Sequence, residues 1–485
     1  MASALDRKQK TSVVDIATTA VNLSLLGLNQ WHNQGGDWDD SISIDLEEVD
    51  MPQTHDRSQQ LYLIFLLGML GFSLVILGIS AVKGNSPDLI VSDGNGYYAW
   101  VRSMVIDGDI NFQNDFEQLY FPDPPPPEWS QRTPTGLVPN KYPIGLAILE
   151  TPGFLLGHAI AQLTPFAKDG ISLPYQLSVT GSLVGLILGS FYLLYQALRN
   201  YQIFSQTALL FCVMPLIGTN LIQYLAKEPA MAHGAGVALI NILIFLSSIK
   251  TSLGKSKFLS GLVPGLLIGL TLIIRLSNIV FLPFFLWLFR ANFRDRYKSL
   301  PLVLGIGIML FLQQFSLFCL WGKPIANSYQ GQGFTGGIQG IFAIILGTHY
   351  GLFLYHPWYL VLVGLNIVGV WFLARPQKLW HGIILFCFTC LWLLNGLWGF
   401  SGDSFGSRAF IETLPVLSLG AAMTVEHLSD RAFHFIRLPG VILAGLLIIT
   451  NIYLWGGYLL QKYPQNSDRT LEQAYLWIIG FQTKL

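Results

Sequence analysis

Long apolar segments constrain this chain more than any other feature. Only 12% of its 485 residues are charged and 52% are hydrophobic, whereas soluble domains carry about 25% charged residues. About 20 apolar residues span a bilayer as a helix. Twelve segments meet or approach this length: 61–82, 142–163, 174–196, 206–224, 230–249, 258–274, 277–290, 300–320, 353–374, 380–398, 410–427 and 440–460. The pattern predicts an all-α polytopic membrane protein.

Basic residues between the segments predict how many of them cross the membrane, because cytoplasmic loops carry an excess of Lys and Arg. If all twelve segments crossed from a cytoplasmic N-terminus, five basic clusters with twelve charges would fall outside. If 142–163 does not cross, all twelve charges fall inside. We therefore predict about eleven transmembrane helices, an outer C-terminus, and a segment 142–163 at the outer interface. The clusters are Arg199, Lys250 to Lys257, Arg290 to Lys298, Arg375 with Lys378, and Arg431 with Arg437.

The chain divides into three predicted parts. Residues 1–58 are polar and rich in acidic residues, and we expect a disordered cytoplasmic tail. Residues 59–463 form the transmembrane domain, in which 83–173 is a large first outer loop with interfacial helices. Residues 464–485 are a short outer segment. We expect the chain in the plasma (inner) membrane, and its zero net charge gives no sign of a nucleic-acid partner.

The first outer loop holds ten acidic residues against five basic ones. Asp93 to Gly96 reads as a turn. Tyr97, Trp100, Val101 and Met104 then share one helical face, which predicts a short amphipathic helix lying on the membrane with its aromatic side down. Asp93 would stand at the N-terminus of this helix, where it could carry chemistry or simply cap the helix.

Four short motifs share the predicted outer side of the chain. They are Ser92-Asp93-Gly94-Asn95-Gly96-Tyr97-Tyr98, Lys141-Tyr142-Pro143-Ile144-Gly145, Glu228-Pro229-Ala230-Met231-Ala232-His233, and Phe405-Gly406-Ser407-Arg408-Ala409-Phe410 followed by Pro415. With this order and placement, the chain resembles the GT-C glycosyltransferases, in particular the protein O-mannosyltransferases and the aminoarabinose transferase of lipid A.

The resemblance implies transfer of a sugar from a polyprenyl-phosphate donor to an acceptor hydroxyl at the outer face, with inversion. It suggests Asp93 as the general base, because a positioned carboxylate can take the hydroxyl proton during attack. Fixed cations would stabilise the departing phosphate, and Lys141 and Arg408 are the candidates. Lys141 could equally be a side chain that only reaches toward the interface. The acceptor, whether protein, lipid or glycan, is not predicted.

Further candidates for substrate binding are Tyr97, Glu228, His233 and Arg275. Glu228 and His233 stand five residues apart at the start of a crossing and could orient donor or acceptor. Alternatively, Glu228 interacts with the helix N-terminus and His233 is a buried, hydrogen-bonded side chain. Arg275 lies between two short segments, and we expect it to pair with an acid of the outer loops, structurally or at the donor phosphate.

No metal and no cofactor is predicted. Asp93, Asp107, Asp109 and Asp115 could gather around a hard cation, but their spacing matches no EF-hand loop. We interpret the last three as turn residues. No P-loop or Rossmann fingerprint appears, which argues against direct use of a nucleotide sugar.

Two alternatives to this enzyme stay open. One is a transporter or flippase for a glycan lipid, although ionisable residues concentrate in the outer loops rather than at mid-membrane positions. The other is an O-antigen ligase or polymerase, whose long loop we would expect late in the chain rather than first.

Overall fold

The computed structural model describes residues 57–83, 89–120, 131–249, 256–323, 328–329, 333–347, 350–398 and 404–460. The chain divides into two units, Met1–Asp56 and Arg57–Leu485, and every described residue belongs to the second. In these ranges the chain is helical and contains no strand, as predicted. The predicted tail, except for residues 57 and 58, and the segment 464–485 lie outside the described residues.

Eight helical segments in the described ranges are long and apolar enough to cross a membrane, which supports a multi-pass membrane protein. One of them is Gly145–Leu163, the segment predicted to stay at the interface, and its length and composition alone would allow a crossing. The segments lie in α2 (Arg57–Lys83), α5 (Gly145–Leu163), α6 (Leu173–Asn200), α10 (Lys257–Ile274), α12 (Arg296–Trp321) and α16 (Arg375–Trp398), in Arg408–Leu428, and in Pro439–Leu459 of α17 (Leu414–Leu459).

Shorter apolar helices account for the other predicted segments. They are α7 (Ser205–Ile217), α9 (Ala232–Ser248), η3 (Leu276–Phe281) with α11 (Leu282–Leu288), α13 (Gly337–Leu346) and α15 (Trp358–Phe372). Of these, α13 matches none of the twelve predicted segments, because it lies between 300–320 and 353–374. The number of crossings stays a prediction. The remaining elements are α3 (Asp93–Arg102), η1 (Ser103–Asp107), α4 (Gln113–Leu119), α8 (Leu221–Ala226), η4 (Arg290–Arg294), α14 (Leu352–Tyr355) and η5 (Arg408–Thr413).

Two predictions for the first outer loop are wrong. Asp93 to Gly96 is not a turn but the first turn of α3. Gly96 in this first turn is required for packing, because a Cβ there would overlap the ring of Tyr142. The aromatic face of α3 does not lie on lipid either: Tyr97 and Trp100 are 6% and 1% exposed, buried against the protein itself. The indole Nε1 of Trp100 donates to the carbonyl of Tyr142 at 2.9 Å.

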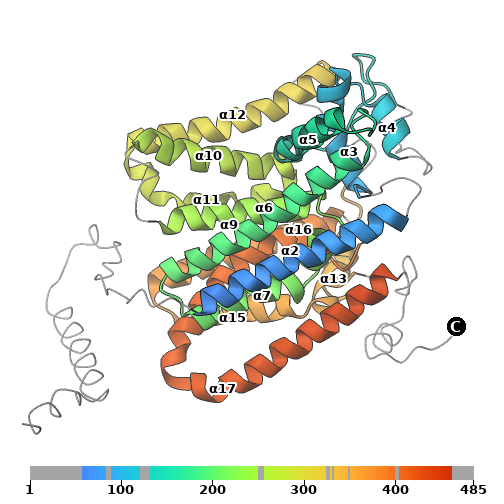
Figure 1. Cartoon of the computed structure of the whole chain (residues 1–485). Helices are drawn as coiled ribbons and strands as arrows, with labels where there is room; N and C mark the ends of the chain where they lie inside the picture. The colour runs from blue at the N-terminus through green and yellow to red at the C-terminus, as the bar shows by residue number, and fades with distance from the viewer. Residues whose placement is uncertain are drawn as a thin grey trace, which may run out of the picture. The chain divides into compact units, whose positions relative to one another are not determined.

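Glycine stripes bring neighbouring helices close together. In α10, a Cβ at Gly261, Gly265 or Gly269 would collide with α12, and successive glycines meet successively later residues of α12. The two helices therefore run side by side in the same direction (Figure 1). Small residues four apart allow this kind of close backbone packing between membrane helices. As a result, the ends of both helices, Ile274 and Trp321, lie on the side of the bundle that holds α3 and α5.

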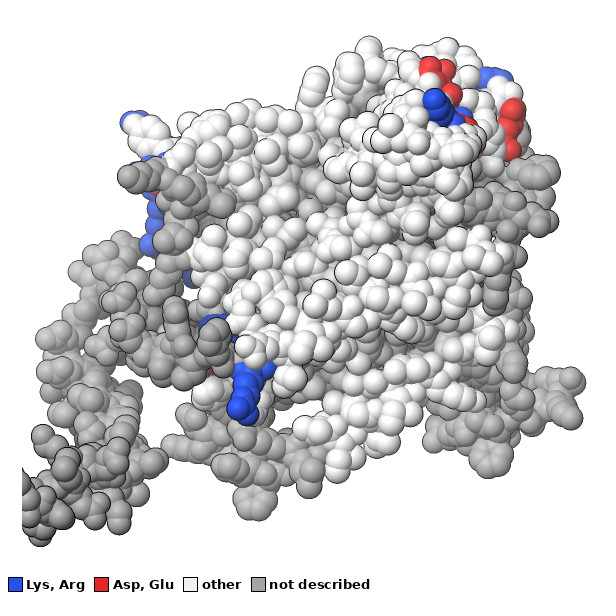
Figure 2. Space-filling model, viewed as in Figure 1, with Lys and Arg blue, Asp and Glu red and all other residues white. Residues whose placement is uncertain are grey.

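Described residues of the predicted cytoplasmic clusters lie at the opposite end of the bundle. Lys257 pairs with Asp295 at 3.0 Å, which joins the starts of α10 and α12. The ends of α6 and α9 meet through Asn200 and Ser248. Figure 2 shows basic side chains along this edge, while the acidic side chains at the upper right, over the region of α3 to α5, lie together with basic ones. The side of the membrane that each end faces stays a prediction.

Candidate functional site

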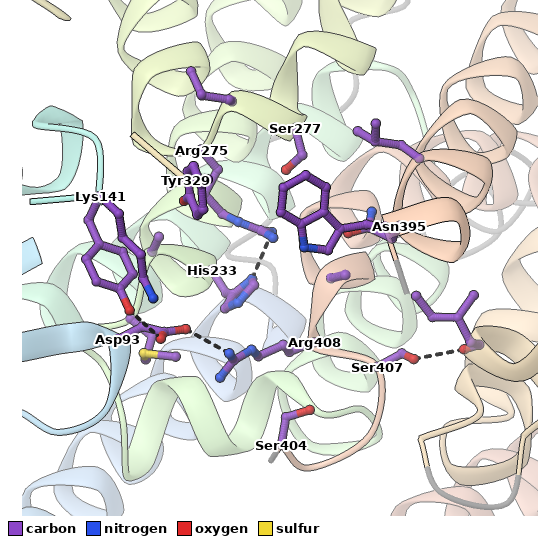
Figure 3. A pocket seen from close by; sticks show the side chains of 18 of the residues that line it. Asp93, Lys141, His233, Arg275, Ser277, Tyr329, Asn395, Ser404, Ser407 and Arg408 are labelled. Carbon is purple, nitrogen blue, oxygen red and sulfur yellow. Dashed lines mark hydrogen bonds and ion pairs between the residues drawn. The ribbon is translucent and has the colours of Figure 1, made fainter. Parts of the chain in front are cut away.

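A cavity of about 510 Å³ opens where the ends of several helices converge. Its walls come from α3, α9, η3, α13, α16 and η5, and from residues between the helices such as Lys141, Tyr142, Tyr329 and Phe334. Six of the seven predicted site residues line it, and Figure 3 shows four of them, Asp93, Lys141, His233 and Arg408, around one space. The predicted residues in the lining are Asp93, Tyr97, Lys141, His233, Arg275 and Arg408.

Asp93 is the first residue of α3, and the residue before it has an unusual backbone. Ser92 has a φ of 56°, in the left-handed region that a non-glycine residue seldom adopts. Strained residues of this kind cluster at functional sites, where the surrounding structure maintains them. This unusual backbone stands directly before the carboxylate that lines the cavity.

The Asp93 carboxylate has a different partner on each oxygen. Arg408 Nη2 donates to Oδ2 at 2.7 Å, and the Tyr142 hydroxyl donates to Oδ1 at 2.6 Å (Figure 3). Burial raises the pKa of Asp93, but the charge of Arg408 and the hydrogen bond from Tyr142 outweigh burial, so the pKa lies below its usual value. Asp93 is therefore an ionised carboxylate at neutral pH.

Lys141 and Tyr142 come from one predicted motif. The Tyr142 ring covers α3, with its centroid 4.8 Å from that of Tyr97. The Lys141 ammonium lies 5.2 Å from the centroid of the Tyr142 ring, which suits a cation–π contact. Burial, followed by the charge of Asp93, raises the pKa of Tyr142 well above its usual value, so its hydroxyl stays a donor. Tyr142 thereby links Asp93 to Lys141.

Arg275 belongs to a second polar group in the cavity wall. It ends α10 in an extended conformation, at the break before η3. Its Nη1 donates to Glu412 Oε1 at 2.8 Å and lies 3.1 Å from His233 Nδ1. We expected the acid partner to come from an outer loop. It comes instead from η5, at the start of the membrane-length segment Arg408–Leu428, within reach of the break between α10 and η3.

Glu228 does not line the cavity in the described structure. It lies between α8 and α9, where Gln223 Nε2 donates to its carboxylate at 3.0 Å. The same Gln223 accepts from Trp455 Nε1 at 2.7 Å. Burial raises the pKa of Glu228, and the charge of Arg408 opposes this rise. Glu228 is thus near Arg408 but separate from the space where a ligand would bind.

In the described part of the first outer loop, Asp107, Asp109 and Asp115 have protein partners of their own. Arg102 Nη1 donates to both Asp107 and Asp115 at 2.7 Å, and Asp109 accepts from the Ser103 hydroxyl at 3.0 Å. Asp115 is a buried ion-pair partner rather than the turn residue that we expected. Within the described ranges, no group of three or more His, Cys, Asp or Glu side chains is arranged to hold a metal ion.

Two residues at or next to the cavity escaped the sequence analysis. Tyr142 was inside a quoted motif, but its contact with Asp93 could not be read from the chain order. Glu412 had a usable signal, because a carboxylate inside an apolar segment is seldom without a function. Comparison of the chain with protein-family models, curated proteins and solved structures found no match. The site therefore rests on its own geometry.

Proposed function

We propose that this chain is a membrane glycosyltransferase. It transfers a sugar from a polyprenyl-phosphate donor to an acceptor hydroxyl at the outer membrane face, with inversion. The observation that carries the proposal is one cavity lined by a carboxylate, Asp93, and by three cationic side chains, Lys141, Arg275 and Arg408. Glycosyl transfer from a lipid phosphate requires both kinds of group, a base for the hydroxyl and cations for the phosphate.

In the proposed reaction, the acceptor oxygen attacks the anomeric carbon from the side opposite the phosphate. The bond from that carbon to the phosphate oxygen breaks, and its electron pair leaves with the phosphate. The hydroxyl proton passes to Asp93. A carboxylate with a lowered pKa is a weak base, so the proton moves as the bond to carbon forms rather than before it.

The cations stabilise the negative charge that develops on the phosphate. Arg275 and Arg408 present planar guanidinium groups that match pairs of phosphate oxygens. The start of α9, at Met231 to His233, also lines the cavity, and it has no side-chain cap. The partial positive charge of a helix N-terminus adds to the attraction for an anion.

The Asp93–Arg408 ion pair responds to the donor. A phosphate that binds Arg408 competes with Asp93 for the guanidinium. Since Arg408 is the main influence that lowers the pKa of Asp93, a weakened pair makes Asp93 a better base. The donor would thereby activate the carboxylate that it needs.

An apolar wall supports a lipid-linked donor. Leu276, Ile279 and Phe334 line the cavity and are 55%, 59% and 64% exposed. These side chains continue the cavity toward the apolar surface of the protein. A polyprenyl chain can leave sideways over them while its phosphate stays among the cations.

Release of polyprenyl phosphate tests the proposal. Purified protein in vesicles is given a panel of polyprenyl-phosphate sugars with membrane extract as acceptor, and mass spectrometry follows the released polyprenyl phosphate. We expect release with the wild type and with Asp295→Asn, a control at the opposite end of the bundle, but not with Asp93→Asn. Movement of the lipid-linked sugar between leaflets without release would overturn the proposal in favour of a flippase.

A further inference from the structure

Glu412 is a fully buried carboxylate that the proposed reaction does not use. It lies in η5, one turn after Arg408, and its side chain is 0% exposed. Removing a carboxylate from water is costly unless partners satisfy it. A buried charge at this position therefore requires a reason beyond packing.

Two cavity residues are the partners of this carboxylate. Arg275 Nη1 donates to Oε1 at 2.8 Å, and His233 Nδ1 lies 3.2 Å from the same oxygen. From the other side α9 restricts Glu412, since a Cβ added to Gly236 would lie 2.9 Å from Glu412 Cγ. These contacts fix the position of the Glu412 side chain, and its ion pair in turn fixes the position of Arg275.

Arg275 borders the cavity with a side chain that is 18% exposed. Glu412 itself is absent from the cavity lining, whereas Arg275 and His233 belong to it (Figure 3). Among the described residues, the hydrogen bonds of Arg275 all run through Nη1. Nε and Nη2, which form the second edge of the guanidinium, make no hydrogen bond in the described part of the chain, and we assign them to a ligand. Such an edge presents two parallel N–H groups, the geometry that fits two oxygens of one phosphate.

We propose that Glu412 is a positioning residue that fixes Arg275 so that its second edge binds the phosphate of the lipid donor. The inference rests on the proposed function, because it presumes a phosphate in this cavity. Glu412 acts through Arg275 and does not touch the ligand. A lysine in place of Arg275 could contact either Glu412 or the phosphate, but it could not offer one flat edge to each.

Binding of a phosphate lipid, measured against the same lipid without phosphate, tests this role. The probes are undecaprenyl phosphate and undecaprenol, and the full chain is titrated with each in detergent. Glu412→Gln keeps an oxygen that accepts from Arg275 but removes the charge. We expect it to weaken undecaprenyl phosphate binding by about 10- to 100-fold and to leave undecaprenol binding unchanged.

Glu150→Gln is the matched control. Glu150 is also 0% exposed, and neither of its carboxylate oxygens has a hydrogen-bond partner in the described part of the chain. Replacing this second buried acid breaks no ion pair or hydrogen bond in the described part of the chain, so the preference for the phosphate lipid should stay as in the wild type. An equal loss in Glu150→Gln would mean that any buried substitution disturbs the cavity, and would overturn the role of Glu412.

A double substitution separates positioning from a general structural role. In an Arg275→Lys background the second edge is already lost, so Glu412→Gln should change the affinity for undecaprenyl phosphate by less than about threefold. A full loss in both backgrounds, or no loss in the single variant, would overturn the inference. If Glu412→Gln does not fold, Glu412→Asp, which keeps the charge but withdraws it by one methylene, should weaken phosphate binding.

The failure of this inference can be told from the failure of the proposed function. Wild-type protein that transfers sugar and prefers the phosphate lipid, with Glu412→Gln indistinguishable from it, rejects only the positioning role. Wild-type protein that neither releases polyprenyl phosphate nor prefers the phosphate lipid rejects both proposals.

Discussion

Two carboxylate–arginine pairs with the same contact distance lie at the same end of this molecule. Asp115 and Arg102 are 2.7 Å apart, and their side chains are 0% and 4% exposed. Asp93 and Arg408 are also 2.7 Å apart, but their side chains are 33% and 17% exposed. The first pair is closed inside the outer loop, whereas the second borders a cavity.

The surroundings separate the two pairs further. Arg102 donates to three acceptors besides Asp115, namely Asp107, Gln118 and the carbonyl of Asp169, so its donors are used within the protein. Arg408 shares its cavity with two further cations and an apolar wall. Identical pair chemistry thus stabilises a loop in one place and offers a charged, accessible site in the other. We therefore expect substitutions in the first pair to change stability and those in the second to change activity.

The largest expected effect is on turnover. Asp93→Asn should lower the release of polyprenyl phosphate by about 10²- to 10⁴-fold, because the amide cannot take the acceptor proton. Asp115→Asn should leave turnover per folded molecule within about threefold of the wild type. Rates measured at saturating donor on both variants test the contrast. Equal losses in the two variants would show that the accessible pair has no special role.

The next effect is on the free energy of unfolding. Here we expect the larger loss in the Arg102–Asp115 pair and the smaller one in the Arg408–Asp93 pair. Arg102→Met leaves Asp115 and Asp107 without their cation, and breaking a buried pair in this way costs about 3–5 kcal/mol. Arg408→Met should cost less, because Asp93 keeps the Tyr142 hydroxyl and borders the cavity. Denaturant unfolding in detergent compares the two variants. A larger loss for Arg408→Met would assign the accessible pair a mainly structural role.

The two pairs also show what could be read from the sequence. Asp93, Lys141 and Arg408 were identified because each is a charged residue beside an apolar segment, within a recognisable motif. Their convergence joins positions 315 residues apart, which helix ends bring together and no local pattern encodes. Asp115 was interpreted as a turn residue because its position in the sequence does not indicate the ion pair with Arg102. Gly96 was read as a turn signal because the ring that requires it, Tyr142, comes from a distant segment.

A smaller effect concerns the shape of the cation. Arg408→Lys keeps the charge but loses the planar fork, so we expect turnover to fall by about 10- to 100-fold, the equivalent of one hydrogen bond to a charged group. Lys257→Arg, a change at the opposite end of the bundle, should have no effect. Turnover with one donor lipid measures both variants. Unchanged turnover in Arg408→Lys would mean that charge alone suffices at this position.

The smallest effect is a difference in pH dependence between the two carboxylates. Burial raises the pKa of Asp115 to about 6 despite the opposing charge of Arg102, whereas an unfolded aspartate has a pKa of about 3.9. Between these values the folded protein binds more protons at Asp115 than the unfolded chain. The free energy of unfolding should therefore fall as the pH rises from about 4 to about 6, by at most about 1.4 kcal/mol per pH unit.

Asp93 should show the opposite sign. Its pKa in the folded protein is lowered, so its contribution to stability is present above the unfolded pKa of about 3.9 and is lost as the pH falls through the folded value. Unfolding midpoints of the wild type, Asp115→Asn and Asp93→Asn between pH 3 and pH 7 separate the two signs. Asp115→Asn should remove the decline between about pH 4 and pH 6, and Asp93→Asn should retain it. Parallel curves for wild type and Asp115→Asn would mean that Arg102 keeps Asp115 ionised, and that the closed pair and the accessible pair differ in exposure alone.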